Sequence, residues 1–600
     1  MRNLIAALFL LAPLAAMAAP AASESERLKQ WLDERYEEEL AFHPEKQTQL
    51  GRKTDYDKLD DYSEAADDAE LQWHLDSVAA MEAAFDRDQL DADARVSYDY
   101  WAYRAERAVE DRRWRRNHYL LNQMSSVHTG LPQFLINYHT VDSQQDMLDY
   151  ISRLKGVATA LGQVQEQVEL AAKEGIRAPR FAYDIVIDQS QSVVTGAPFD
   201  DSEEAAALWA DVQGKLAALQ DSGDIDASRA DELRALARKA LLDAVAPAYR
   251  SLIAWLQQDR ANTDAEPQGA SSLPGGQDYY AYRLRSYTTT DMSAEQVHQL
   301  GLAEVKRIRS EMEAIRKEVG FDGDLAAFFE FVRSDARFYY PNTDAGRQAY
   351  IDETEHYLDL IADKLPEYFG ILPKASLEVR RVEAFRERDG AAASYSTGTA
   401  DGSRPGVYYM HLSDMSANNR TDLQTTAYHE GNPGHHMQSS IALERSDLPL
   451  FRSDVWYSAY GEGWALYSEL LAWEMGVYDN PYYNFGRLGA EIFRAIRLVV
   501  DTGMHAKGWS EEQAVQYMLE NSAIPETSVR SEIQRYLVWP GQATSYKVGM
   551  LKILELRERA RAALGDKFDI RAYHDLVLGG GSLPLGILER RVDEWIASQV

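Results

Sequence analysis

Residues 429–438 read His-Glu-Gly-Asn-Pro-Gly-His-His-Met-Gln. A second segment, Tyr-Gly-Glu-Gly-Trp-Ala, follows at 460–465 and contributes a further carboxylate. Three of the thirteen histidines of the chain fall within eight positions of the first segment. Imidazole and carboxylate groups are the ligands of many catalytic zinc sites, which use three protein ligands and leave one position open. The two segments therefore predict a metal centre with His429 and Glu462 among its ligands and Glu430 as a general base.

The spacing of the histidines differs from the familiar zinc motif H-E-x-x-H, in which both histidines lie on one helix face. On an unbroken helix, His435 would point about 120° away from His429, and His436 would lie about 10 Å further along the axis. Pro433 lacks a backbone N–H and crowds the preceding turn, so with Gly434 it predicts a two-residue bulge. Such a bulge makes His435 the second histidine ligand, with His436 as the alternative.

A helix end with a Pro-Gly turn, whose histidines only cap and hydrogen-bond, is the alternative to a metal site. A single histidine would favour that interpretation. Three histidines and a glutamate within eight residues, followed by a second acidic group, favour metal binding instead. The expected cofactor is one zinc ion per chain, held by His429, His435 and Glu462.

The motif resembles that of a bacterial family of largely uncharacterised predicted zinc metallopeptidases, broadly similar to the gluzincin peptidases. The resemblance rests first on His429-Glu430-x-x-Pro433-Gly434-His435-His436 and on Glu462-Gly463-Trp464-Ala465. It runs from the first helices to the C-terminus and is most specific from about 390 to 590. Further family-like blocks are Asp501–His505, Arg535-Tyr536, Pro540–Lys547, Tyr573–Asp575 and Leu583–Leu585.

The resemblance implies a zinc peptidase with His429, His435 and Glu462 as ligands and Glu430 as base. The Glu462-Gly463 pair is similar to the N-E-G-F-A segment of the aminopeptidase N family, whose glutamate is the third zinc ligand. Gly434-His435 is similar to part of H-E-M-G-H in angiotensin-converting enzyme. The Pro-Gly insertion departs from both families.

Hydrolysis of an amide develops negative charge on the carbonyl oxygen, so a hydrogen-bond donor must face it. Tyr546 is the first candidate, because it follows a Gly-led approach to a helix and related helical metallopeptidases use a downstream Tyr or His. His505 and His574 are the other candidates, each with an aspartate nearby in the sequence that could fix its tautomer. A structural role in the helix core or on its surface is the alternative for each.

Three further residues are predicted to bind the substrate: Arg535, Tyr536 and Lys547. Arg535 and Lys547 could bind the carboxylate of a peptide, and Arg535 could do so through two parallel hydrogen bonds. An ordinary structural role is again the alternative for each residue.

Residues 1–18 predict a cleavable signal peptide. Arg2 precedes an apolar run of about 13 residues, which is too short for a bilayer that needs about 20, and Ala16-Met17-Ala18 is typical of a cleavage site. The chain has no cysteine and therefore no site for a lipid anchor or a disulfide. We expect a periplasmic or secreted protein with no stable membrane anchor after cleavage; an uncleaved N-terminal anchor is the alternative.

The remaining pattern predicts a mainly α-helical protein. Apolar residues recur at three- and four-residue spacing in 202–220, 228–258, 293–319, 344–364 and 485–500. Strand-like runs at 377–385, 393–396 and 406–412 predict a small antiparallel sheet just before the metal helix. The last of these runs is either an exposed edge that pairs with an extended peptide or part of a buried hairpin.

The polar stretch 261–277 is rich in Gly, Pro and Ser and is the clearest candidate for a boundary between lobes, although a surface loop would look the same. We expect one catalytic unit of two lobes, a metallopeptidase-like fold. The N-terminal helical lobe would span 19–270 and the zinc-binding lobe 271–600.

The net charge of −33 argues against nucleic acid as a partner, because phosphates require a basic surface.

Taken together, the motif, its resemblance and the predicted leader favour an exported zinc metallopeptidase that hydrolyses short peptides. The alternatives are a periplasmic zinc- or peptide-binding protein without turnover, and a zinc hydrolase of a non-peptide amide or ester. Glu430 argues against the binding protein, because binding alone needs no base beside the first ligand. Oligomeric state does not follow from the sequence.

Overall fold

The computed structural model describes residues 22–383, 387, 393–453 and 455–600, so the predicted signal peptide lies outside the described residues. About 70% of the chain is helical, and the described part contains one small three-stranded sheet. The mainly α-helical fold is thus confirmed. Among the described helices, none is both long enough and apolar enough to cross a bilayer.

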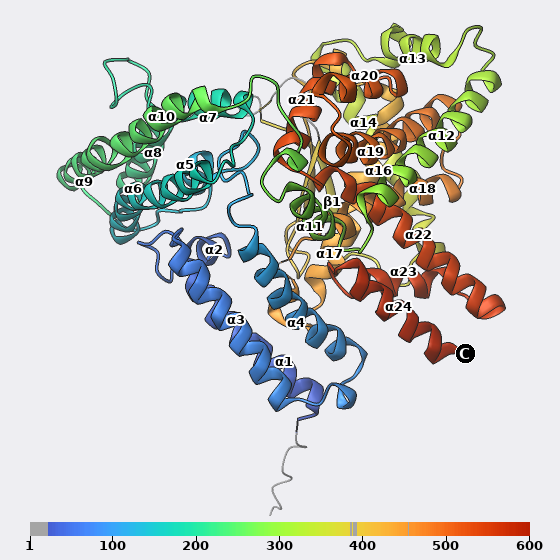
Figure 1. Ribbon diagram of the computed structural model, residues 1–600, viewed down its shortest axis with the longest axis horizontal. Coiled ribbons are helices and arrows are strands. Elements are labelled where there is room, and N and C mark those ends of the chain that lie inside the picture. The colour runs from blue at the N-terminus through green and yellow to red at the C-terminus, as the bar shows by residue number, and fades with distance from the viewer. Residues whose placement is uncertain (1–21, 384–386, 388–392, 454) are drawn as a thin grey trace, which may run out of the picture.

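The N-terminal helices pack against the C-terminal half of the chain. Leu32 and Trp101 belong to the same core as Tyr467 and Leu588. Figure 1 shows these helices, in blue, below the larger body of the molecule. They are α1 (Glu24–Glu39), α2 (Pro44–Gln49), α3 (Glu64–Ala84) and α4 (Ala92–Arg113).

The next six helices form a core of their own, whose buried residues run from Leu121 to Leu256 and are joined by Val538. In Figure 1 this group, in teal and green, lies beside the larger body. The cores therefore group α1–α4 with the second half of the chain, and the predicted lobe boundary near 270 stays a prediction. The six are α5 (Val127–Asn137), α6 (Gln144–Lys173), α7 (Arg180–Val193), α8 (Ala207–Asp221), α9 (Ala227–Ala240) and α10 (Ala246–Asp259).

The stretch 228–258, predicted as one helix, forms α9 and α10 with a π-helical turn between them at Leu241–Val245. Pro247 follows directly in the first turn of α10. Because proline has no N–H to bond back along the helix, the wider turn allows the chain to continue without a regular bond at that point.

The larger body contains the remaining helices, and α18 and α19 have buried residues along most of their length. Such all-round burial marks interior helices. The helices are α11 (Gly276–Thr288), α12 (Ala294–Glu318), α13 (Leu325–Ser334), α14 (Asp344–Ala362), α15 (Leu365–Tyr368), α16 (Arg420–Glu430), α17 (His435–Glu444), α18 (Ser458–Glu474), α19 (Pro481–Lys507), α20 (Glu511–Asn521), α21 (Glu526–Val538), α22 (Ser545–Leu564), α23 (Ile570–Gly579) and α24 (Leu585–Gln599).

The sheet has the order β1 (Leu377–Arg381), β3 (Gly406–Met410), β2 (Ser394–Ser396). The expectation of an antiparallel sheet is wrong for one pair, because β1 and β3 run parallel while β2 and β3 run antiparallel. The chain reverses into β2 and reverses again into β3, so β3 has the direction of β1. As the central strand, β3 is paired on both sides, and it does not offer the free edge predicted for a substrate peptide.

Candidate metal centre

The histidine motif forms two helices instead of one bulged helix. Helix α16 ends at Glu430, and α17 begins at His435. A side chain at Gly434 would lie 2.0 Å from the carbonyl oxygen of His429, so only glycine fits this close return of the chain. The carbonyl of Pro433 accepts hydrogen bonds from two residues of α18, Trp464 Nε1 at 2.8 Å and Ser468 Oγ at 3.2 Å, which fix the break in place.

This break brings three potential ligands together. His429 Nε2 lies 3.6 Å from Glu462 Oε2, and His435 Nε2 lies 3.7 Å from the same oxygen. The three donor atoms all lie within 4.8 Å of one another. His429 ends α16, His435 begins α17 and Glu462 comes from the first turns of α18, so three elements converge on one point.

The donor set fits a zinc ion. Tetrahedral zinc with bonds of about 2.0–2.1 Å places its ligand atoms about 3.3 Å apart. The two nitrogen–oxygen distances of 3.6 and 3.7 Å are close to that value. Two imidazoles and one carboxylate also match the ligand types of catalytic zinc sites, which keep a further position open.

A second carboxylate, that of Glu469, orients the His429 ring through the nitrogen that faces away from Glu462. His429 Nδ1 lies 2.7 Å from Glu469 Oε1, two turns beyond Glu462 on α18. In the neutral ring Nδ1 then carries the proton, and the lone pair of Nε2 points toward Glu462. Burial lowers the pKa of His429, but Glu462 and Glu469 raise it to about 10, so these surroundings stabilise a positive charge.

We expect Glu469→Gln to weaken zinc binding about 10- to 100-fold, because the amide orients the imidazole less strongly than a carboxylate does. Titration of zinc against a chelator measures this effect. Glu474→Gln, on the same helix but paired with Arg557, is the matched control and should leave zinc affinity unchanged. Equal affinities for the Glu469 variant and the wild-type protein would remove Glu469 from the site.

His436 points elsewhere. Its side chain is buried, Nδ1 lies 3.0 Å from the hydroxyl of Tyr395, and the ring also bonds the backbone of Ala375. Burial lowers the pKa of His436 to about 4, so the ring is neutral. His435, by contrast, has a buried Nδ1 without a hydrogen-bond partner among the described residues, while its Nε2 faces Glu462. The geometry therefore favours His435 over His436 as the ligand.

Glu430 follows His429 at the end of α16 and is nearly buried. It forms no ion pair with any residue in the described parts of the chain. Burial raises the pKa of Tyr408 on β3 well above its ordinary value, and the charges of Tyr350 and Glu430 add to this effect. A carboxylate without a cationic partner beside the ligands suits the predicted role of a base.

Tyr546 is the second residue of α22, which crosses α18 at very close range. Ser545 Oγ lies 2.7 Å from Ser458 Oγ, and a Cβ on Gly463 would lie 2.6 Å from the backbone of Gly549. Tyr546 follows the first of these contacts, and Glu462 precedes Gly463 in the chain. This crossing places the predicted oxyanion donor on the helix next to that of the metal ligand, and its role stays a prediction.

His505 has no nitrogen available for catalysis. Its Nδ1 accepts a hydrogen bond from the backbone N–H of Ala270 at 2.8 Å, and its Nε2 donates to the carbonyl of Tyr536 at 3.0 Å. Burial lowers the pKa of His505 to about 4. We therefore correct the catalytic prediction for His505: the residue links α19 to neighbouring backbone. His574 is likewise buried, with ring contacts to Tyr467 and to the carbonyl of Tyr368.

Arg535 and Tyr536 lie at the end of α21. The Tyr536 side chain is buried, and its hydroxyl donates to Glu532 at 2.6 Å and accepts from Arg497 at 2.9 Å. That hydroxyl is therefore committed to an internal pair. Arg535 is partly exposed, donates to Gln542 at 2.8 Å and stays a candidate for binding substrate.

Lys547 cannot bind a peptide carboxylate as predicted. Its Nζ is fully buried and lies 2.6 Å from Glu491 Oε1 and 2.9 Å from Glu304 Oε2. Burial raises the pKa of Glu491, but Lys547, Arg307 and Arg487 hold it at about 2. Lys547 therefore joins α22 to α12 and α19 as part of a buried ionic network.

We expect Lys547→Ala to lower the free energy of unfolding by about 3 kcal/mol, because it removes one partner of a buried ion pair. Lys507→Ala, which breaks an exposed pair with Glu295, should cost less than about 1 kcal/mol. Urea denaturation of both variants measures the difference. Equal urea midpoints of unfolding for the two variants, together with loss of peptide binding by Lys547→Ala, would contradict the structural role and support Lys547 as a substrate-binding residue.

Two arginines near Tyr546 were not predicted from the sequence. The guanidinium carbon of Arg497 lies 4.7 Å from the centre of the Tyr546 ring, and that of Arg494 lies 5.9 Å away. Both belong to α19, in the run Phe493-Arg-Ala-Ile-Arg-Leu-Val-Val500. Charged residues spaced by three within an apolar helix are the signal that could have indicated them, because unpaired charges are rarely buried.

A second group of possible ligands lies in the N-terminal helices and consists of Glu39, Glu70 and His74. Arg104 binds the Glu39 carboxylate through both terminal nitrogens, and His43 Nε2 lies 3.0 Å from Glu70 Oε1. These cationic partners already neutralise the carboxylates. We interpret the group as an ion-pair network between α1, α3 and α4.

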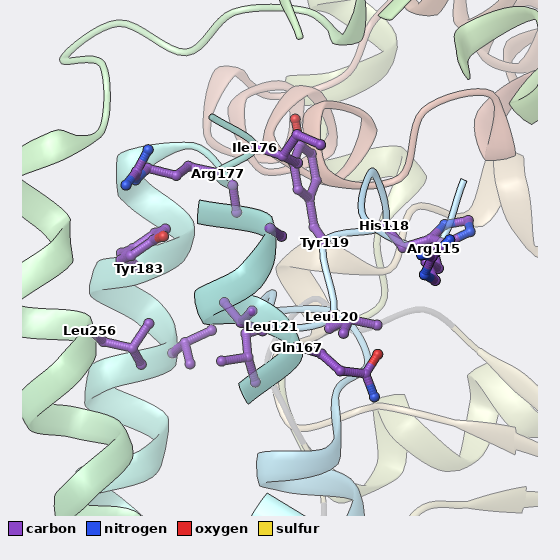
Figure 2. A pocket seen from close by; sticks show the side chains of 14 residues that line it. Arg115, His118, Tyr119, Leu120, Leu121, Gln167, Ile176, Arg177, Tyr183 and Leu256 are labelled. Atoms are coloured by element: carbon purple, nitrogen blue, oxygen red, sulfur yellow. The ribbon is translucent and has the colours of Figure 1, made fainter. Parts of the chain in front are cut away.

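A mainly apolar pocket lies in the helical group α5–α10, apart from the histidines. Figure 2 shows Tyr119, Leu121 and Tyr183 gathered around it, with Gln167 of α6 and Leu256 of α10. Arg177 at its border is paired with Asp259. The pocket offers no group of converging catalytic side chains, so we place the candidate site at the histidine cluster.

The fold and the cluster define a mainly helical protein with two histidines and one carboxylate converging on a single point. The chain belongs to a bacterial family, DUF885, which is described as bacterial protein of unknown function and matches residues 44–592. Among curated proteins, none matches the chain at a significant level.

Two solved structures share this fold. A presumed lipoprotein from Colwellia psychrerythraea has a TM-score of 0.85 and 29% sequence identity, covering 96% of this chain and 100% of that one. A presumed lipoprotein of unknown function from Shewanella oneidensis has a TM-score of 0.73 and 18% identity, covering 95% and 99%. The second similarity concerns the fold alone.

Proposed function

We propose that the protein is an exported zinc-dependent metallopeptidase that hydrolyses peptide bonds in short peptides. The observation that carries the proposal is the convergence of His429, His435 and Glu462, with nitrogen–oxygen distances of 3.6 and 3.7 Å. A structural histidine pair would not need a carboxylate at this spacing and a free glutamate next to it. The resemblance of the motif to gluzincin peptidases points to the same chemistry.

His429, His435 and Glu462 would hold one zinc ion. Zinc supplies Lewis acidity at such a site, because it polarises a carbonyl group and lowers the pKa of water. Glu469 keeps the Nε2 lone pair of His429 directed into the site. His429 and Glu469 are buried, and the side chains of His435 and Glu462 are only 12% and 19% exposed, which limits the access of competing water.

Glu430 would move the proton in the reaction. It accepts a proton from the attacking water and delivers it to the amine that leaves when the C–N bond breaks. Tyr546 would donate a hydrogen bond to the oxygen that gains negative charge. The products are a carboxylate and an amine, so water is the only co-reactant.

Export rests on two observations. The first 18 residues have the pattern of a cleavable leader, and the two similar structures are described as presumed lipoproteins. We therefore infer that the protein acts in the periplasm or outside the cell. Fractionation of cells that produce the full chain tests this inference.

Incubation of the zinc-loaded protein with a mixed peptide library, followed by mass spectrometry, tests the function. We expect new peptide termini that appear with zinc and disappear after chelation. Cleavage of ester or non-peptide amide probes alone would favour the other hydrolase, and binding of zinc and peptides without any product would favour the binding protein.

A further inference from the structure

Two arginine side chains of α19 lie against Tyr546, and a third is linked to them through a shared carboxylate. Arg497 and Arg494 place their guanidinium carbons 4.7 and 5.9 Å from the centre of its ring. Arg535 joins them through Glu532, whose carboxylate lies 3.0 Å from Arg497 and 3.4 Å from Arg535. We call Arg494, Arg497 and Arg535 the arginine cluster.

The arginine cluster carries more positive charge than its partners neutralise. Glu532 pairs with both Arg497 and Arg535, so two cations share one carboxylate. Arg494 forms no ion pair with any residue in the described ranges. Its charge lowers the pKa of Asp422, although burial, the larger effect, raises that pKa. In a chain with a net charge of −33, such a local excess of positive charge marks a place for an anion.

Each arginine of the cluster also has a buried N–H group without a hydrogen-bond partner among the described residues. These groups are Nη1 of Arg497 and Nε of Arg494 and Arg535. Arg497 as a whole is only 4% exposed. Buried donors of a charged group are costly to leave unsatisfied, so oxygen acceptors from a ligand are the expected partners.

A chain of polar contacts connects the arginine cluster to the start of α18, the helix that carries Glu462. Arg535 Nη2 donates to Gln542 Oε1 at 2.8 Å, and Gln542 Nε2 lies 3.5 Å from Ser458 Oγ. Ser458 begins α18 and precedes Glu462 by about one helical turn, or about 6 Å along the axis. These contacts tie the arginine cluster to the helix that carries Glu462.

We propose that the arginine cluster binds a carboxylate of the substrate, and that this carboxylate is the free C-terminus of a peptide. This proposal rests on the metallopeptidase function argued above and makes the protein a carboxypeptidase. Guanidinium groups bind carboxylates with two parallel hydrogen bonds, which fixes direction as well as position. Water adds to the carbonyl carbon of a bond near the C-terminus, that C–N bond breaks, and the released fragment keeps the bound carboxylate.

The test uses one peptide sequence in two forms, with a free C-terminal carboxylate and with a C-terminal amide. Calorimetry measures their binding to the zinc-loaded Glu430→Gln protein, and mass spectrometry measures their cleavage by the wild-type protein. We expect the acid to bind roughly 10- to 100-fold more tightly, the effect of one charge-assisted pair. We also expect the wild-type protein to cleave the acid at its C-terminal end.

Arg494→Gln in the Glu430→Gln background should bring acid and amide to nearly equal affinity. Arg494 is partly exposed, so this change should preserve the fold, which thermal unfolding checks. Arg530→Gln is the matched control, because Arg530 lies on α21, is partly exposed like Arg494, and has its charge paired with Glu512 and Glu526. The control should keep the full preference for the acid.

Equal binding of acid and amide, while the wild-type protein still cleaves peptides, would overturn the carboxylate site and leave the peptidase function standing. An amidated peptide with an internal glutamate, bound as tightly as the free acid, would overturn the assignment to the C-terminus. Preferential binding of the acid without any cleavage by the wild-type protein would confirm the arginine cluster and reject the carboxypeptidase.

Discussion

Glu430→Gln is expected to retain zinc and bind peptide while its turnover falls by about 10² to 10⁴-fold, the usual contribution of a general base. The side chain keeps its size, but an amide cannot accept and return a proton. Glu430 has no ion pair among the described residues whose loss would disturb the fold. Turnover of a cleaved peptide, measured beside zinc content, shows whether chemistry or binding is affected.

Glu520→Gln provides the control for this experiment, because Glu520 is exposed on α20 and should be neutral for turnover. Equal activity of the Glu430 variant and the wild-type protein on every cleaved peptide would reject Glu430 as the base. Loss of zinc by the same variant would instead make Glu430 a ligand.

His435→Ala is expected to lower zinc affinity by more than about 100-fold, because two remaining protein ligands rarely hold a catalytic zinc. His436→Ala should lower it less than about 10-fold, because His436 contacts Tyr395 and not Glu462. The two residues are adjacent, so the pair of variants differs only in which imidazole is removed. Titration against a chelator ranks them.

The reverse ranking would mean that the chain between the two helices places His436 at the centre. Equal and small effects for both variants would separate the histidine motif from metal binding altogether. Thermal unfolding of each variant distinguishes loss of a ligand from loss of the fold.

Much of the fold was predictable because helix patterns are local. The spacing of apolar residues in 293–319 corresponds to α12, and Ser293 caps that helix as its sequence indicates. The sheet was harder, because the direction of β3 relative to β1 depends on the path between them. The grouping of α1–α4 with the C-terminal helices depends on contacts separated by hundreds of residues, for which no local pattern exists.

The histidine pair shows which part of the candidate site the motif alone could predict. Pro433 and Gly434 indicated an interruption and favoured His435, and the structure brings His435 to His429. The sequence did not show that the helix ends and restarts. That outcome depends on Trp464 and Ser468, which hold the interrupting turn from another helix.

The roles of Lys547 and His505 could not be predicted from the sequence blocks around them. The carboxylates that neutralise Lys547 come from Glu304 and Glu491, which are remote in sequence. The partners of His505 are backbone groups of Ala270 and Tyr536. Whether a polar residue in a motif faces a substrate or a buried partner depends on such distant contacts.

The zinc content of the purified protein tests the central claim most directly. After loading and removal of free metal, the wild-type protein should carry about one zinc per chain. His429→Ala and Glu462→Ala should lose that zinc while circular dichroism shows an intact helical fold. A wild-type protein that takes up no zinc, or full retention of zinc by both variants, would contradict the account.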